Sequence, residues 1–338
     1  MRIGRYRWAA AMLALIAAMP ATSRAQDAKK VVLALPTATM TFSNVFIALD
    51  AGYFKEEGLD VTLPVLVGVA SVNAVINGSA DFTIGTGPVF LRAAARGQKL
   101  LAIANLSDRP NIELVMRKDV AEAMKFNDKM SLAERGKLLK GRTIAIQGVG
   151  TIVHAWPRLL AARGGLDPEA DMRIAPMEPP SMLAALQTKA VEGFATSLPY
   201  TTDAVLRGAA VMFASAARGD APDILPFGGL LIEVKPETCR ADAAKCAGLV
   251  RALVRAGRTI REKPNEALEI VRKRFKEMSP ELLEKAWPTI VAAQAKDVHV
   301  TAKALENSEK VNIEAKLLDP KDRVTSFEGL TTDEFVPK

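Results

Sequence analysis

The segment QGVGTIVHAW, residues 147–156, combines two glycines, Thr151 and His154 in a pattern that could do chemistry. A phosphate-binding loop would need the pattern G-x-x-x-x-G-K-[ST], but here the glycines are two apart and no lysine follows. A catalytic or metal-bound histidine would need a partner acid or further histidines at a useful spacing, and the chain's other histidine is His299. The segment is therefore interpreted as a turn between a strand and a helix, with its amides near a crevice.

Other enzymatic patterns are missing from the sequence. No G-x-S-x-G nucleophile elbow occurs, and neither a CxxC redox motif nor a zinc-binding spacing is present. The two cysteines, Cys239 and Cys246, are seven apart, and one continuous helix would hold them roughly 10 Å apart, too far for a bridge. If Cys239 lies in a turn and Asp242 caps a helix that contains Cys246, the gap can close. In an oxidising compartment we expect a structural disulfide; two inert buried thiols are the alternative.

The first 25 residues are typical of a secretory signal peptide. Three arginines precede an apolar run at residues 8–19, and Pro20 and small residues lead to an expected cleavage after Ala25. The alternative is a membrane anchor, but about a dozen apolar residues are too few for a bilayer core that needs roughly 20. No cysteine near the cleavage point encodes a lipid anchor. We expect a soluble, exported mature protein.

The charge of the mature chain excludes one class of partner. The net charge is +7, and removal of the first 25 residues, with four arginines and no acid, leaves +3. Positive and negative residues are interspersed, so the clustered basic face of a nucleic-acid-binding protein is absent. About 313 residues remain after cleavage, enough for two hydrophobic cores.

The elements that must position these residues alternate between strands and helices. In the first series we expect strands near 31–37, 59–66, 81–87 and 100–106, with helices at 43–51, 71–80 and 88–97. A second series starts at residue 142, with a helix near 151–163 and strands near 172–177, 191–196 and 209–215. This rhythm predicts parallel sheets flanked by helices. The chain crosses between the two units near 112–118 and 227–235, and two crossings make a hinge with a ligand-binding crevice.

Five segments resemble, in the same order, signature segments of a known family. They are IALDAGYFKEEGLDVTL (47–63), INGSADFTIGT (76–86), KGRTIAIQGVGTIVHAW (140–156), AARGGLDPEADMRI (161–174) and LAALQTKAVEGFATSLP (183–199). The family is the NMT1/THI5-like group of periplasmic substrate-binding proteins of ABC importers, which includes alkanesulfonate, taurine, nitrate and formyl-aminopyrimidine receptors. The last segment departs from the pattern, because Lys189-Ala190 stands where a glycine is usual.

The resemblance implies an α/β, two-lobe periplasmic-binding-protein fold (type II), each lobe a mostly parallel sheet flanked by helices. We expect lobe I at residues 26–115 plus 228–338 and lobe II at 116–227, joined by two hinge crossings. The implied function is capture of one small solute, an organic anion or a pyrimidine- or amine-type molecule, with no cofactor or metal.

The implied partners are an ABC permease and its ATPase in the inner membrane, and we expect a periplasmic monomer. Two alternatives are a pyrimidine-synthase-type enzyme, as in the THI5-like part of the family, and a ligand-sensing subunit for a membrane kinase. An enzyme of that type uses a Cys-rich motif that this chain lacks, so we expect a non-enzyme.

In lobe I, ligand contacts are expected from the loops after the strands, where helices begin and amides can bind an anion without formal charge. The candidate residues are Thr39, Thr41, Phe42, Ser71, Thr86, Gly87 and Asn105. Helix capping by Thr41, Ser43 or Ser71 is the alternative for these hydroxyls. Asn105 could equally be a turn residue.

In lobe II, the candidates are Gly150, Thr151, His154, Glu178, Ser197 and Tyr200. A cleft-facing Glu178 would favour an amine or pyrimidine ligand, although the residue could instead be a favourable charge at a helix N-terminus. Tyr200 could stack on a flat ligand opposite Phe42. His154 could donate a hydrogen bond, or it could serve only for packing. Because these loops carry almost no arginine or lysine, a multiply charged anion is not expected.

Overall fold

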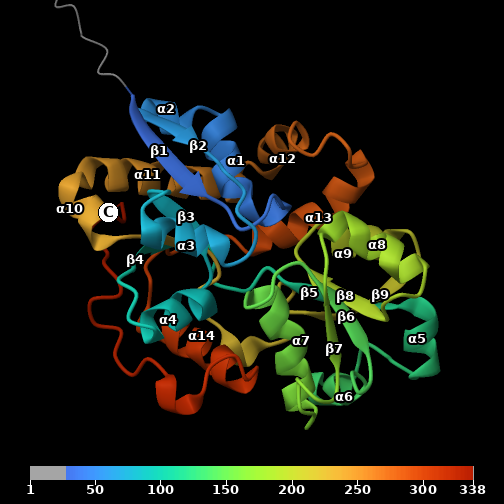
Figure 1. Cartoon of the computed structure of the whole chain (residues 1–338). Coiled ribbons are helices and arrows are strands. Elements are labelled where there is room, and N and C mark those ends of the chain that lie inside the picture. Colours follow the sequence, from blue (N-terminus) through green and yellow to red (C-terminus); the bar gives the residue numbers. More distant parts are fainter. Residues whose placement is uncertain (1–27, 338) are drawn as a thin grey trace, which may run out of the picture.

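The computed structural model describes residues 28–337, so the expected signal peptide lies outside the described residues. Two lobes, each built on one sheet, lie side by side with the C-terminal helices packed around them (Figure 1). Within residues 28–337 no helix is both long and apolar enough to cross a membrane. The predicted α/β two-lobe fold is confirmed.

The first sheet has five strands in the order β2-β1-β3-β10-β4. These strands are β1 (Lys29–Ala34), β2 (Leu59–Thr62), β3 (Phe82–Gly85), β4 (Leu101–Asn105) and β10 (Leu231–Val234). β1 pairs in parallel with β2 and β3, whereas β10 runs antiparallel between β3 and β4. The parallel strands therefore end at one edge, where their loops can meet the other lobe.

Helices cover both faces of this sheet, as its continuous apolar strands require. α1 (Ser43–Asp50), α2 (Tyr53–Glu56) and α11 (Ala243–Glu262) bury one core with Phe82 and Ile84 of β3. α3 (Ala70–Asn77) and α4 (Gly87–Ala95) bury the other. α3 ends at Gly78, whose φ of +83° is a left-handed conformation that favours glycine.

The second sheet has five strands in the order β7-β6-β8-β5-β9. They are β5 (Glu113–Arg117), β6 (Thr143–Ile146), β7 (Arg173–Pro176), β8 (Gly193–Thr196) and β9 (Ala210–Ser215). β6 is parallel to β7 and β8, and β5 is antiparallel to β8 and β9. The flanking helices are α5 (Lys118–Ala123), α6 (Leu132–Lys137), α7 (Ile152–Arg163), α8 (Pro179–Gln187) and α9 (Tyr200–Leu206).

The predicted crossing strands are members of the sheets themselves. Residues 113–117 pair with β8 and β9 in the second sheet, and residues 231–234 pair with β3 and β4 in the first. The two linkers between the sheets are therefore 106–112 and 216–230. The lobe boundaries expected from the sequence, at 115/116 and 227/228, stay a prediction.

The C-terminal part consists of α10 (Pro236–Ala241), α11, α12 (Pro264–Arg272), α13 (Pro280–Ala292) and α14 (Ala302–Glu314). Cys239 in α10 and Cys246 in α11 form the expected disulfide, with Cα atoms 5.7 Å apart. Asp242 separates the two helices, and its side chain accepts a hydrogen bond from Lys245 N at 3.0 Å. This interruption lets cysteines seven residues apart approach each other.

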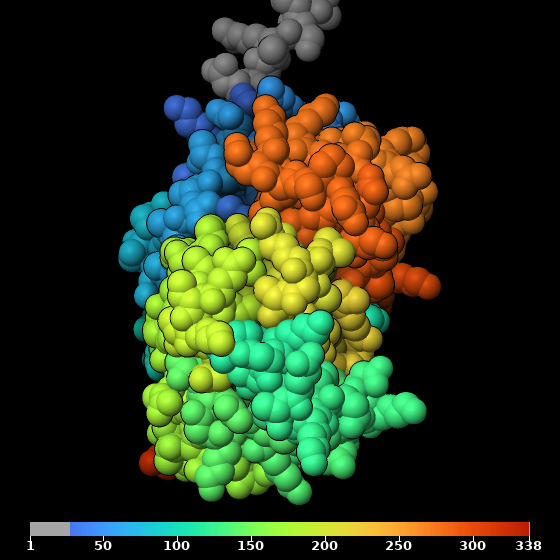
Figure 2. All heavy atoms as spheres, turned by 90° about the vertical axis from the view of Figure 1, so that its right-hand side faces the viewer, coloured from blue at the N-terminus to red at the C-terminus, as the bar shows by residue number. Residues whose placement is uncertain are grey.

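Two C-terminal helices contact both lobes. α14 packs against α4 of the first lobe and α7 of the second, and its residue Val311 and the adjoining Ala315 belong to the second lobe's core. α13 packs against α9, and Figure 2 shows the orange α12–α13 region lying directly against the yellow-green surface of the second lobe. The two lobes are thus in contact on both sides of the crevice.

Candidate ligand-binding site

A cavity of about 70 Å³, the interlobe cavity, lies between the ends of the parallel strands of the two lobes. One water needs roughly 10–15 Å³ on this scale, so the space suits a solute of a few heavy atoms. Segments after β1, β2, β3, β6 and β8 and both linkers form its wall. The polar side chains in the wall are Thr37, Thr41, Ser71, Thr86, Asn111, Gln147, Thr151 and Ser197.

Four helices begin at the interlobe cavity. Phe42 precedes α1, Ser71 lies in the first turn of α3, and Thr86 and Thr151 are the N-cap residues of α4 and α7. Neither of these two N-cap threonines uses its side chain to cap its own helix. The positive ends of these four helix dipoles favour an anion at this position.

Three polar atoms of the wall are buried without a hydrogen-bond partner among residues 28–337. They are the Oγ1 atoms of Thr41 and Thr86 and Oδ1 of Asn111. A buried polar group left unpaired costs about 1–3 kcal/mol, and a polar ligand in the cavity would remove that cost. No lysine, arginine, aspartate or glutamate is in the described wall, so the cavity is polar without formal charge.

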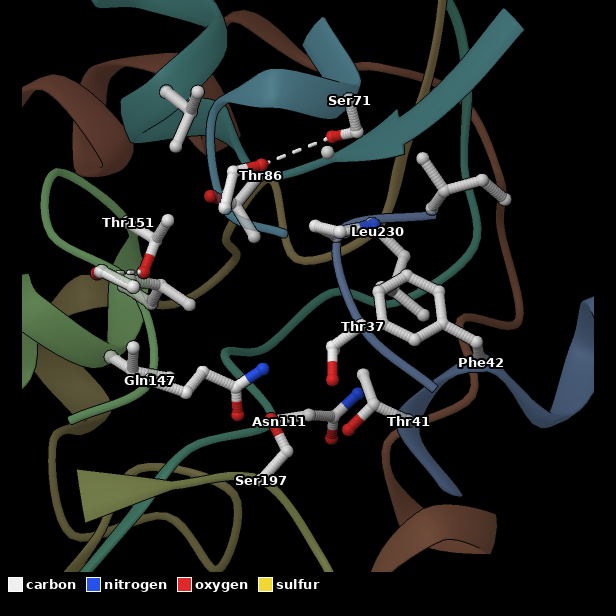
Figure 3. Close-up of a pocket in the computed structure, with 18 of the residues that line it drawn as sticks. Thr37, Thr41, Phe42, Ser71, Thr86, Asn111, Gln147, Thr151, Ser197 and Leu230 are labelled. Carbon is white, nitrogen blue, oxygen red and sulfur yellow. Dashed lines mark hydrogen bonds between the residues drawn. The ribbon is translucent and has the colours of Figure 1, made fainter. Parts of the chain in front are cut away.

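Figure 3 shows how the labelled side chains surround the space. Gln147 reaches in from the second lobe, opposite the Phe42 ring and close to Asn111. Thr196 Oγ1 donates to Gln147 Oε1 at 2.7 Å, which leaves the amide nitrogen of Gln147 as a donor for the cavity. Ser71 Oγ and Thr151 Oγ1 donate to the carbonyls of Gly68 at 3.2 Å and Gly148 at 2.7 Å, bonds that shape the two turns.

The structure brings together about half of the candidates predicted from the sequence. The wall includes Thr41, Phe42, Ser71, Thr86, Thr151 and Ser197. The other seven, Thr39, Gly87, Asn105, Gly150, His154, Glu178 and Tyr200, do not line the cavity. Thr39 is buried beside it, and its Oγ1 also has no partner within residues 28–337.

Gly87 and Asn105 hold the second linker instead of facing the cavity. The Gly87 amide donates to the Gly228 carbonyl at 2.7 Å, so it is not free for a ligand. Asn105 Nδ2 donates to the Phe227 carbonyl at 2.9 Å, and its Oδ1 accepts from Leu230 N at 3.3 Å. Both residues thereby position Leu230, which does line the cavity.

Gly150 and His154 shape the turn that follows β6. The Gly150 N–H donates to His154 Nδ1 at 3.1 Å, and the Gly150 carbonyl accepts from Arg92 of the first lobe. Burial, together with the charges of the nearby Arg158 and Arg92, lowers the pKa of His154 to about 4. His154 is therefore neutral at physiological pH and acts as an acceptor for the turn.

Glu178 and Tyr200 lie outside the interlobe cavity. Glu178 is exposed at the N-cap position of α8, which agrees with the helix-terminus alternative. Tyr200 lines a larger groove of about 810 Å³ between α8–α9 and α12–α13, whereas Phe42 does not line that groove. Phe42 and Tyr200 therefore do not line a common space in this structure. Burial and the charge of Glu178 raise the pKa of Tyr200.

Sequence reasoning missed several wall residues. Gln147 follows β6 directly, so the rule that strand ends line the crevice could have found it. Pro36 and Thr37 follow β1 in the same way. Asn111 and Gly229 lie in the linkers, where no local sequence pattern signals proximity to a ligand. Within residues 28–337 no cluster of three or more His, Cys, Asp or Glu is arranged to hold a metal.

A family model described as NMT1/THI5 like matches residues 39–267. A search of curated proteins found no matching sequence. Among solved structures, a protein from Bordetella bronchiseptica RB50 is 20% identical with a TM-score of 0.72, covering 90% of this chain and 95% of the other.

Two further similar structures have described ligand classes. The alkanesulfonate-binding protein SsuA from Xanthomonas axonopodis pv. citri, bound to MOPS, is 18% identical with a TM-score of 0.68, covering 87% of this chain and 95% of its own. The periplasmic nitrate-binding protein NrtA from Synechocystis PCC 6803 is 13% identical with a TM-score of 0.65, covering 91% and 87%. At these identities the likeness establishes the shared fold.

Proposed function

The chain belongs to the NMT1/THI5-like family, and from this premise we propose that it is a solute receptor of an ABC importer. It captures a small molecule in the interlobe cavity and delivers it to a membrane permease driven by an ATPase. The observation that carries this proposal is the cavity itself, which is lined by residues of both lobes and holds unpaired polar atoms from the first lobe and the first linker. Residues 1–25 are proposed as the signal peptide that directs the receptor to the periplasm.

We propose a small organic anion with a single charge as the ligand. Four helix N-termini and the unpaired hydroxyls of Thr41 and Thr86 favour negative charge. A multiply charged anion would require cationic side chains, and the described wall has none. An amine would favour a carboxylate in the wall, and Glu178 is exposed outside it. The sulfonate and nitrate ligands of SsuA and NrtA are of the proposed charge class.

Ligand capture is proposed to proceed by hinge closure. In this structure the Met40 N–H donates to the Leu198 carbonyl at 3.2 Å across the crevice, so the lobes are in contact over the cavity. A ligand bound by both lobes stabilises this closed arrangement over an open one, and the permease would recognise the closed form.

We propose a non-enzymatic role. The THI5-like enzyme alternative uses a Cys-rich motif, which this sequence lacks. The sensor alternative shares the same binding site, and it would be distinguished by a membrane kinase, in place of a permease, that binds the loaded receptor.

Titration calorimetry tests the ligand class. Methanesulfonate, nitrate, acetate, a pyrimidine amine and inorganic phosphate would be compared on the mature chain, with thermal unfolding as a second readout. We expect at least one monoanion to bind and to raise the melting temperature, because a ligand that binds only the folded state stabilises it. Tighter binding of the amine or of phosphate would refute the ligand class, and no binding by any compound would remove the main support for a receptor.

A further inference from the structure

Arg92 is a buried arginine that links the two lobes beside the interlobe cavity. It lies in the second turn of α4, and only 6% of its surface is exposed. Its guanidinium donates to two acceptors, Asn312 Oδ1 on α14 and the carbonyl oxygen of Gly150 after β6. The second bond crosses from the first lobe to the second.

The guanidinium is held in place from the α14 side. Asn312 Nδ2 donates to the Pro88 carbonyl at 3.0 Å and to Glu309 Oε2 at 2.9 Å. Glu309 Oε1 in turn accepts from Val324 N at 2.6 Å. Because its partner Asn312 is fixed by this network, Arg92 is preorganised to meet the Gly150 carbonyl.

The Gly150 carbonyl is equally well fixed on the second lobe. Gly150 has a φ of +76°, a conformation that favours glycine, and its amide is bonded to His154 Nδ1 at 3.1 Å. Gly148, two residues before it, and Thr151, directly after it, line the cavity. A displacement of the Gly150 carbonyl would therefore also displace Gly148 and Thr151 in the cavity wall.

We propose that Arg92 is a positioning residue that holds the turn at residues 148–151 against the first lobe and so completes the wall of the interlobe cavity. The inference rests on the proposed receptor function and adds a named residue that favours the closed form. Arg92 acts through Gly150 and does not itself line the cavity.

The hydrogen bond between the Arg92 guanidinium and the Gly150 carbonyl can break and re-form as the lobes open and close. Burial, together with the charge of Arg96, lowers the pKa of Arg92 to about 10, so the group remains charged at neutral pH. Its partner is a neutral carbonyl, which water can replace when the lobes separate. A hydrogen bond to a charged group contributes enough to shift the closed-to-open ratio by roughly tenfold to a hundredfold. Ligand affinity should fall by up to the same factor, since the apparent affinity scales with the populated fraction of the closed form.

Arg135 provides a matched control because it is also buried, with 9% of its surface exposed. It donates to the carbonyls of Met130 at 2.8 Å and Phe213 at 3.0 Å and pairs with Asp220 at 3.0 Å. All of these partners belong to the second lobe. Replacing Arg135 therefore removes a buried arginine network without removing the bond between the lobes.

The test compares Arg92→Gln and Arg92→Lys with Arg135→Gln and Arg135→Lys. Hydrogen exchange of residues 148–154 would be followed in the ligand-free protein, with residues 144–146 of β6 as an internal reference. The affinity for methanesulfonate and the melting temperature would be measured on the same samples.

We expect Arg92→Gln to speed exchange in the turn at least tenfold relative to β6 and to weaken methanesulfonate binding about tenfold. Arg92→Lys should be intermediate, because one ammonium group cannot reach both acceptors in the arginine geometry. The Arg135 variants should lower the melting temperature while turn exchange, relative to β6, and affinity stay within twofold of the parent.

Equal exchange in the turns of the Arg92 and Arg135 variants would overturn the proposal. Should Arg92→Gln fail to fold, the Arg92→Lys variant decides the question by the same readouts. If methanesulfonate does not bind the parent protein, the proposed ligand class fails, and the exchange measurement alone still decides the role of Arg92.

Discussion

His154 Nδ1 accepts a hydrogen bond from the Gly150 N–H at 3.1 Å, and this bond requires an unprotonated Nδ1 atom. Burial is the main reason that the pKa of this histidine falls to about 4, with Arg158 and Arg92 as further causes. In an unfolded chain the same histidine would titrate near its ordinary value of about 6.5. The folded protein therefore binds fewer protons at this residue between pH 6.5 and 4.

Replacement of His154 by Asn should flatten the acid side of the stability profile. A lowered folded pKa means that the histidine's contribution is fully present above pH 6.5 and is lost as the pH falls toward 4. The parent should lose up to about 3 kcal/mol over this interval from His154 alone. Urea unfolding at pH 7.5, 5.5 and 4.5 measures the difference.

His299→Asn is the control for that experiment. His299 is exposed and paired with Asp297, whose hydrogen bond raises the pKa of His299, so its small contribution has the opposite sign. The contribution of His299 to stability is present below pH 6.5 and is lost as the pH rises. Parallel stability profiles of His154→Asn and the parent would contradict the assignment of His154.

Thr41→Val should weaken binding of the proposed anion by about tenfold and leave stability unchanged or slightly raised. The Oγ1 atom of Thr41 is buried in the cavity wall without a partner among residues 28–337, so the free protein loses nothing when it is removed. Thr83→Val is the matched control, because Thr83 Oγ1 already donates to the Ala34 carbonyl at 2.9 Å. It should reduce stability and spare affinity. Calorimetry with a monoanion and thermal unfolding separate the two effects.

Glu233→Gln should stabilise the protein more at pH 8 than at pH 5. Glu233 on β10 is fully buried and its carboxyl oxygens have no partner within residues 28–337, so burial raises its pKa well above the usual range. A raised folded pKa means that stability is lost as the pH rises through that value. Denaturant unfolding at the two pH values measures the gain, and an equal change at both would show that Glu233 does not titrate as described.

Removal of the disulfide between Cys239 and Cys246 by a double alanine substitution should cost about 2–3 kcal/mol, as expected for a short closed loop. Urea unfolding of the variant against the oxidised parent measures this loss. Reductant should destabilise the parent by a similar amount and leave the variant unaffected. A variant as stable as the oxidised parent would mean that α10 and α11 are held together by packing alone.

Glu178→Gln and Tyr200→Phe should each leave monoanion affinity within twofold of the parent. Glu178 is exposed, and Tyr200 lines the larger groove and not the interlobe cavity. Calorimetry with the same monoanion provides the measurement. A tenfold loss of affinity in either variant would indicate that the ligand binds in that groove.

The sequence predicted the alternation of strands and helices and the disulfide because these depend on local patterns. The helix starts at Thr86 and Thr151 were also predictable, since each follows a strand directly. Gly87 and Asn105 were misjudged because their hydrogen-bond partners, Gly228 and Phe227, lie more than 100 residues away in the chain. No local pattern reports such a partner.

The position of each crossing strand within its sheet could not be predicted from the sequence for a related reason. A run such as residues 227–235 predicts a strand, but its place in a sheet depends on which edges are free in three dimensions. Arg92 was likewise passed over, because its sequence context is that of an ordinary helix and its role depends on Asn312 and Gly150.

Because β10 lies between β3 and β4 in the first sheet, the order in which the chain emerges determines which sheet can form first. β3 and β4 are neighbours in sequence but are joined only through β10, so the first sheet stays split until residues 231–234 have emerged. The second sheet is complete once residue 215 has emerged. The lobe that is synthesised first is therefore finished last, which lengthens the time during which the nascent chain stays incompletely folded.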